Sequence, residues 1–325
     1  MKIIRWLPDT FVLLILAAVL LASLLPVAGQ AAQWFGYFTQ AAIALLFFMH
    51  GAKLSAQQVR AGLGQWRLHL AVFACTFALF PLLGWLLRPV FSAVVGQELT
   101  LGLLFLCALP STVQSSIAFT AMAGGNVAAA VCSAATSSLL GVFVTPLLVV
   151  LMFGVHGDFA LGPAVLQVAL QLLLPFALGQ WARRWIGAWV QRHRSWLKQV
   201  DNSSILLVVY GSFSAAVVGG IWQRVDAWHL ALLLVLCVML LALVFAITLG
   251  LGQLCGFAWE DRKTLFFCGS KKSLTTGIPL ANVLFPAVSV GLMILPTMLF
   301  HQIQLLACAY VARRWGHAGS QSQAH

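Results

Sequence analysis

Apolar residues gather into runs that are long enough to cross a bilayer, and short polar segments separate these runs. A helix needs about 20 residues to span a hydrocarbon layer roughly 30 Å thick. The pattern therefore predicts ten transmembrane helices, at residues 10–27, 33–50, 69–87, 99–122, 127–153, 161–182, 202–221, 229–256, 264–284 and 287–312. We expect an all-α membrane protein that forms a single polytopic membrane domain over residues 1–325.

The composition agrees with a membrane protein. Hydrophobic residues make up 62% of the chain and charged residues only 8%, and the mean hydropathy is +0.98. A soluble domain has about 45–50% apolar and about 25% charged residues. The formal net charge of +11 does not indicate a nucleic-acid partner, because the basic residues stand in small groups between apolar runs. No CxxC and no His/Cys cluster with metal-ligand spacing occurs, so we expect no metal site and no cofactor.

The basic residues also predict the orientation. Fourteen Lys and Arg residues fall in predicted loops on one side, whereas Arg88 and Arg224 alone fall on the other. Loops rich in Lys and Arg stay in the cytoplasm. We therefore expect both termini to be cytoplasmic, in the plasma membrane, which is the inner membrane if the protein is bacterial.

Two segments of the chain are similar to each other. "LFLCALPSTVQSS" (104–116) aligns with "LFFCGSKKSLTTG" (265–277) at an offset of 161 residues. Each half would contain five spans. Because five is an odd number, the two copies would lie in opposite orientation in the membrane, which is the inverted-repeat design of many secondary transporters. The expected repeats cover approximately residues 1–155 and 160–315. Chance similarity between two Leu- and Phe-rich segments is the alternative.

Both similar segments interrupt a helical pattern in the middle of a span. Pro110 precedes the polar run "STVQSS", and "GSKKSLTTGIP" contains Gly269, Gly277 and Pro279. Non-helical backbone is tolerated at membrane depth only where protein or a water-filled cavity satisfies it. Two such breaks at equivalent positions point to a transporter's binding site. The alternative is a pair of kinked helices whose polar side chains bond to neighbouring turns.

Lys271 and Lys272 lie within the second break, whereas all seven acidic residues fall at predicted span ends or in loops. A charge at the bilayer centre costs about 2.5–3.5 kcal/mol on insertion scales, and an anionic substrate would compensate it. The candidate substrate-binding residues are Lys272, Lys271, Ser273, Thr275, Thr276, Ser111, Thr112, Gln114, Ser115 and Ser116. The alternative is that Lys271 reaches water while Lys272 is structural. His301, Gln302 and Gln304 are candidates to line a pathway, and His301 is the candidate proton relay.

Two segments, "SKKSLTTGIPLANVLF" (270–285) and "LPSTVQSSIAFTAMAGGN" (109–126), carry a family resemblance. Through them, and through its length and span number, the chain resembles the bile acid:sodium symporter (BASS) superfamily, in particular its atypical SBF-like branch. The resemblance implies that the broken fourth and ninth helices cross at mid-membrane. It implies a core domain at approximately 69–153 and 229–312, and a panel domain at approximately 10–50 and 161–221. It further implies an organic anion as substrate and favours Lys272 as the lysine that receives it.

The resemblance carries over the sodium sites only in part. The candidate cation-binding residues are Ser115, Ser116, Ser133, Thr136 and Ser270. A typical Ser-Asn pair falls on Ser115 and Ser116, and a typical carboxylate falls on Ser270. Because the amide and the carboxylate are missing, we expect weak sodium dependence, with the membrane potential or H⁺ as the alternative driving force.

Together these features predict a secondary active transporter of a small organic anion that works by alternating access. Its partners would be the lipid bilayer, the organic anion and either Na⁺ or H⁺. Two alternatives stay open. The protein could be a membrane regulator of ion homeostasis that transports nothing itself, or an intramembrane enzyme with a Ser–Lys dyad. We assign no catalytic residue, because the predicted interior holds serine and lysine but no acid and no set of metal ligands.

Overall fold

The computed structural model describes residues 10–53, 65–153 and 169–322, and within these ranges the chain is helical with no strand. In lipid every backbone polar group must be satisfied within the protein, and a helix does this along its own length. The prediction of an all-α membrane protein is thus confirmed. Six of the described helical segments are long and apolar enough to cross a membrane: Gly29–Met49, Trp66–Ala108, Val127–Phe153, Ser195–Val218, Ala227–Leu254 and Ala287–Gly316.

The chain divides into two compact units, each built from three stretches of sequence. The first unit comprises Met1–Leu54, Gly162–Asp226 and Ile278–Leu292. The second unit comprises Ser55–Leu161, Ala227–Gly277 and Met293–His325. Each unit therefore contains residues from both halves of the sequence.

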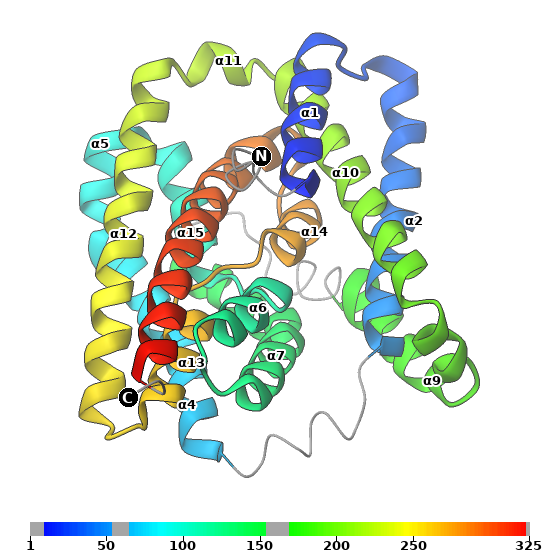
Figure 1. The fold of residues 1–325 in the computed structure, drawn as a ribbon. Coiled ribbons are helices and arrows are strands. Elements are labelled where there is room, and N and C mark those ends of the chain that lie inside the picture. Colours follow the sequence, from blue (N-terminus) through cyan, green and yellow to red (C-terminus); the bar gives the residue numbers. More distant parts are fainter. Residues whose placement is uncertain (1–9, 54–64, 154–168, 323–325) are drawn as a thin grey trace, which may run out of the picture. The chain divides into compact units, whose positions relative to one another are not determined.

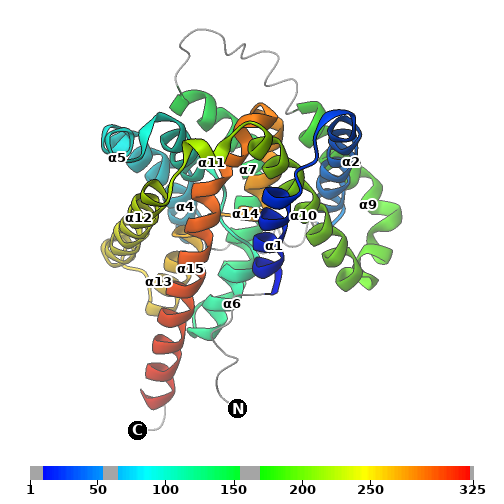
Figure 2. The ribbon, with the colours of Figure 1, turned by 90° about the horizontal axis from the view of Figure 1, so that it is seen from above.

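The first unit contains five helices before the chain enters α14. They are α1 (Thr10–Leu24), α2 (Gly29–Lys53), α9 (Leu174–Arg192), α10 (Arg194–Val218) and the short α11 (Ile221–Arg224), with a π-helical turn, Ala169–Leu173, ahead of α9. In Figures 1 and 2, α10 lies between α1 and α2, and α9 packs on α2. The beginning of the predicted span 161–182 lies outside the described residues.

Helices α2 and α9 approach each other closely through two glycines. A Cβ atom on Gly179 would lie 1.9 Å from the carbonyl oxygen of Phe48, and one on Gly51 would lie 2.1 Å from that of Phe176. No side chain fits at either position without moving a backbone. Small residues allow membrane helices to pack backbone against backbone, which increases their van der Waals contact.

The second unit begins with a nearly continuous helical run. Its helices are α4 (Trp66–Ala74), the π-helical turn η3 (Cys75–Leu79), α5 (Phe80–Ala108), α6 (Gln114–Met122), α7 (Val127–Phe153), α12 (Ala227–Leu254) and α13 (Trp259–Gly269). The division between the units falls within two further helices, α14 (Leu274–Leu284) and α15 (Ala287–Ser322). The start of α14 and most of α15 belong to the second unit.

Helix α5 changes direction at Gly96, whose φ of 77° and ψ of 172° are not helical. The run Trp66–Ala108 has 43 residues, and a straight helix of that length would measure about 65 Å, twice a bilayer core. It therefore holds the predicted span 69–87 and the first part of the predicted span 99–122. The predicted loop between residues 87 and 99 is wrong in extent, because the connecting residues continue the helical hydrogen bonds on either side of Gly96.

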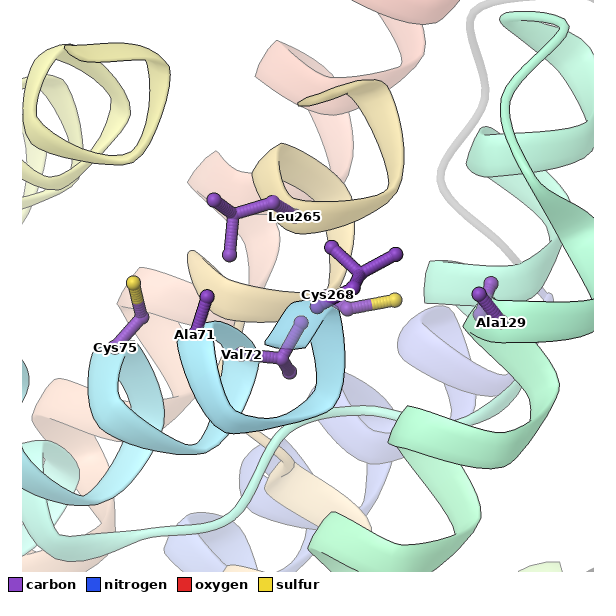
Figure 3. Close-up of a cluster of buried hydrophobic side chains, with 8 residues drawn as sticks. Ala71, Val72, Cys75, Ala129, Leu265 and Cys268 are labelled. Atoms are coloured by element: carbon purple, nitrogen blue, oxygen red, sulfur yellow. The ribbon is translucent and has the colours of Figure 1, made fainter. Parts of the chain in front are cut away.

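A cluster of small and aliphatic side chains holds α4, α7 and α13 together. The buried residues of this cluster are Leu68, Ala71, Val72, Cys75, Ala129, Ala130, Leu265 and Cys268. Figure 3 shows Ala71 and Val72 on α4 beneath α13, with the Cys268 side chain directed toward Ala129 of α7. Cys75 and Cys268 are free thiols and serve here as packing residues. The cluster fixes the end of α13, where the second helix break begins.

Candidate substrate site at the two helix breaks

The two predicted breaks are present, and they meet within the second unit. Helix α5 ends at Ala108 and α6 begins at Gln114, while α13 ends at Gly269 and α14 begins at Leu274. The backbone N–H of Ser273 in the second break donates to the carbonyl oxygen of Pro110 in the first, at 2.8 Å. The two segments, 161 residues apart in the alignment of the halves, are therefore in direct contact.

Side chains of the first break cap the end of α13. The last carbonyl groups of a helix have no partner within it and need one from elsewhere. Ser111 Oγ donates to the carbonyl oxygen of Cys268 at 2.6 Å, and Ser116 Oγ donates to that of Phe267 at 3.0 Å. These two candidate substrate-binding residues thus have a structural contact in this state of the protein.

Helices α7 and α15 satisfy further backbone groups at the breaks. Thr145 Oγ1 donates to the carbonyl oxygen of Ala108 at 2.9 Å, and Ser137 Oγ accepts from the N–H of Ser111 at 3.2 Å. Gln304 accepts from the N–H of Lys272 and donates to its carbonyl oxygen, both at 2.9 Å. The sequence analysis missed Ser137 and Thr145. What could have indicated them in the sequence was a hydroxyl side chain within an apolar run.

Lys272 is fully buried, and its ammonium is enclosed by main-chain oxygens. Nζ donates to the carbonyl oxygens of Thr76 at 2.8 Å, Cys107 at 2.8 Å and Leu109 at 2.6 Å. We call these three oxygens the carbonyl cage. An ammonium has three N–H donors, and all three are used here. The Phe80 ring centroid lies 4.1 Å from Nζ, where the negative ring face attracts a cation.

The backbone makes these carbonyls available. In the π-helical turn the N–H of Phe80 donates to the carbonyl oxygen of Cys75 rather than to that of Thr76. The next residue, Pro81, has no N–H that could donate to Thr76 in its place. At the first break, the N–H of Ser111 bonds to Ser137 instead of Cys107. Leu109 lies outside the helix altogether. Each oxygen of the carbonyl cage has thus lost its helical donor through a local irregularity of the chain.

Lys271 is also fully buried, but its ammonium has different surroundings. Within the described residues Nζ has no hydrogen-bond partner. It lies 4.4 Å from the ring centroid of Phe119 on α6 and 5.8 Å from that of Phe267 on α13. Ring faces attract a cation, but they do not replace the oxygen partners that a buried charge requires.

The other candidate residues form two short hydroxyl groups beside the breaks. Ser115 Oγ donates to Thr112 Oγ1 at 2.8 Å, and Thr112 is 2.9 Å from Ser116 Oγ. Ser273 Oγ lies 3.1 Å from both Thr275 Oγ1 and Thr276 Oγ1. Ser111, Thr112, Ser116 and Ser273 are buried, Ser115 and Thr276 are half-buried, and Gln114 and Thr275 are exposed.

The candidate cation-binding residues outside these groups make contacts of their own. Ser133 Oγ lies 2.6 Å from Nδ1 of His69, and the Ser270 hydroxyl donates to the carbonyl oxygen of Phe266. Thr136 is half-buried on α7. The sequence analysis assigned no role to His69, whose signal was a histidine at the start of an apolar run.

The candidate relay His301 lies next to the residue that holds the second break. Its Nδ1 is 2.8 Å from Nε2 of Gln304, which also donates to the carbonyl oxygen of Lys272. Gln302, a candidate to line a pathway, is half-buried on the same helix. His301 is therefore connected to the break through one amide side chain.

Long apolar helices and two interrupted helices that cap each other define a class, the multi-pass membrane transporters with discontinuous helices. The chain belongs to the SBF-like CPA transporter family, whose model matches residues 9–317. This confirms the resemblance to the bile acid:sodium symporter superfamily and identifies the chain as a member of a membrane transporter family.

Relatives match nearly the whole chain. The "Uncharacterized protein PA2026" of Pseudomonas aeruginosa is 57% identical over 312 residues, 96% of this chain and 94% of that protein. "Putative symporter YfeH" of Escherichia coli (strain K12) is 52% identical over 324 residues, 100% and 97% of the two chains. "Sodium/bile acid cotransporter 7" of Rattus norvegicus is 30% identical over 275 residues, 82% and 79% of the two chains.

Proposed function

We propose that the protein is a secondary active transporter of a small organic anion and works by alternating access. The observation that carries this proposal is the meeting of two helix breaks beside a buried ammonium, that of Lys271, which has no hydrogen-bond partner in the described residues. Broken helices of this kind form the substrate and ion sites of many secondary transporters. The names of the relatives, a symporter and a cotransporter, agree with coupled transport.

The contacts at the breaks support an inverted repeat. Ser111 and Lys272 stand at equivalent positions of the two halves, as do Cys107 and Cys268. Ser111 donates to the carbonyl oxygen of Cys268, and Lys272 donates to that of Cys107. This reciprocity favours two inverted halves, for which we propose five spans each, and the distribution of basic residues favours both termini in the cytoplasm. The reciprocity also favours a core domain that holds both breaks and a panel domain formed from residues 10–50 and 161–221.

Two helix N-termini adjoin the breaks and favour an anion. The first turns of α6 and α14 carry a partial positive charge, since their N–H groups have no acceptor within the helix, and that of Thr276 in α14 donates to Ser273 Oγ at 3.2 Å. Polar side chains with access to solvent or substrate lie on these turns: Gln114, Ser115, Thr275 and Thr276. Glu98, Glu260 and Asp261 are the acidic residues described in the second unit, and each stands about ten residues before a break, on the order of 15 Å along its helix.

Of the two lysines, we propose that Lys271 receives the anion. All three donors of Lys272 are bonded to the carbonyl cage, so an anion would have to displace a carbonyl group to bind it. Within the described residues the ammonium of Lys271 makes no hydrogen bond, so its donors are available to an anion, and the Phe119 ring lies beside it. The sequence-based preference for Lys272 stays a prediction that the same experiment tests.

A thermal-shift screen of the purified protein against anionic metabolites tests the proposal, because a ligand that binds the native state raises the melting temperature. We expect at least one anion to raise it saturably in the wild type and in Lys263→Met, a control on the same chain segment before the break. The shift should be absent in Lys271→Met. If Lys271→Met keeps the shift and Lys272→Met loses it, Lys272 is the receiving lysine. If no anion produces a shift, the proposed substrate class is wrong.

A further inference from the structure

We propose that the carbonyl cage is a binding site for a small monovalent cation and that the ammonium of Lys272 occupies it as a tethered ligand. The side chain would hold permanently the position that a free Na⁺ or ammonium ion would otherwise take. This proposal does not depend on the transported substrate, because it concerns only the contacts that Lys272 makes within the second unit.

The geometry is that of an ion site rather than of a single hydrogen bond. Three main-chain oxygens converge on one nitrogen at 2.6 to 2.8 Å, and the Phe80 ring covers a further side. Backbone carbonyl groups coordinate monovalent cations in channels, and carbonyls of unwound segments and helix C-termini do so in transporters. The carbonyl cage combines these elements, since two of its oxygens come from the end of α5 and the segment that follows it.

The oxygens owe their availability to the backbone and not to Lys272. Pro81 and the π-helical turn leave the carbonyl oxygen of Thr76 without a helical N–H donor. The break at Pro110 leaves the carbonyl oxygens of Cys107 and Leu109 without one. The C-terminal end of a helix also carries partial negative charge. A variant that lacks the lysine side chain would therefore retain a buried, negatively polarised cavity without an occupant.

A cation held by a covalent tether has a consequence for the protein. The ammonium connects the π-helical turn, the end of α5 and the second break, and this connection does not depend on the ion concentration around the membrane. The crossing of the broken helices is thus stabilised without a dissolved ion. The positive charge also opposes the entry of Na⁺ into the same place.

Chemical rescue of Lys272→Ala tests the inference. The melting temperature of the purified variant would be measured in choline, sodium, potassium, ammonium, ethylammonium and propylammonium chlorides at equal ionic strength. We expect a lower melting temperature than the wild type in choline and a saturable rise with one or more of the small cations. The alkylammonium ions replace the deleted atoms and should act at the lowest concentration. The wild type should show no such cation-specific rise, because its site is filled.

Lys271→Ala is the matched control, because within the described part of the chain its ammonium donates to no carbonyl oxygen. It should show no cation-specific rise. The inference would be overturned if Lys272→Ala responds equally to choline and to every small cation, or if wild type and Lys271→Ala respond as it does. If Lys272→Ala does not fold, Lys272→Met and Lys272→Gln decide the matter. Met supplies no hydrogen-bond donor and Gln supplies two. We therefore expect the wild type to be the most stable, the Gln variant to be intermediate and the Met variant to be the least stable. A Met variant as stable as the wild type would overturn the inference.

Discussion

At the scale of single residues, two adjacent lysines illustrate how differently a protein interior can treat the same charge. The ammonium of Lys272 makes three hydrogen bonds to main-chain oxygens, whereas that of Lys271 faces the rings of Phe119 and Phe267. Hydrogen bonds to a charged group contribute about 1.5–3 kcal/mol each, and a lost partner leaves a buried polar group unsatisfied. The two side chains should therefore have opposite effects on the stability of the empty protein.

We expect Lys272→Met to lower the free energy of unfolding by about 1–3 kcal/mol or more, because it leaves buried carbonyl oxygens without a donor. Lys271→Met should be neutral or stabilising, because it removes a buried charge that has no hydrogen-bond partner within the described residues. Melting temperatures of both variants in the same detergent and without substrate check this. The prediction fails if Lys271→Met is the less stable of the two.

At the scale of the elements, the sequence predicted the helix breaks but not what surrounds them. Pro110 and the polar runs marked both breaks, because proline and clustered hydroxyls interrupt an apolar helix visibly in the sequence. The carbonyl group of Thr76 could not be predicted as a partner of Lys272. Its availability depends on a π-helical turn, which differs from an α-helix by one hydrogen-bond shift and has no clear sequence signature.

The loop predicted between residues 87 and 99 was wrong for a related reason. Loss of hydrophobicity marks where a span ends, but it does not show that the backbone leaves the helix. Here a single glycine, Gly96, provides the change of direction with a positive φ, and the residues on both sides stay helical. Hydrophobic patterns thus located the spans more reliably than the connections between them.

The glycine contact between α2 and α9 gives a prediction at this scale. Gly179→Val should separate the two helices, because even a Cβ atom would lie 1.9 Å from the carbonyl oxygen of Phe48. Overpacking of this kind costs about 1–3 kcal/mol or more, so we expect a lower melting temperature and less folded protein. Gly36→Ala on α2, the partner helix of α9, is the control, since no atom outside its own stretch of helix lies within 4 Å of the added methyl group. Equal stability of the two variants would contradict the backbone-to-backbone packing.

At the scale of the whole molecule, the family assignment and the site contacts answer different questions. The match over residues 9–317 identifies a transporter family. The hydrogen bonds at the site bear on a different question, namely which ion gradient or potential would drive transport by this chain. Of the candidate cation-binding residues, Ser115, Ser116, Ser133 and Ser270 each have a hydrogen-bond partner within the second unit. An ammonium also lies where the two breaks meet, among carbonyl oxygens that suit a small cation.

We therefore expect transport of the organic anion to depend only weakly on sodium. In proteoliposomes at constant ionic strength, replacing external Na⁺ by choline should change the initial rate of uptake by less than about tenfold, which corresponds to less than about 1.4 kcal/mol of coupling. Changes in membrane potential or pH should have the larger effect, because the site would move a net charge or a proton together with its anion.

A comparison of the sodium dependence of Lys272→Met with that of the wild type tests this prediction. If the tethered ammonium replaces a dissolved cation, its removal should make binding or uptake more dependent on Na⁺, while the control Lys263→Met should not have that effect. Uptake rates of the three proteins over a series of sodium concentrations measure it directly. A steep and saturable sodium requirement in the wild type would contradict the prediction, since it would mean that a free cation is bound even while the ammonium of Lys272 lies among the carbonyl groups.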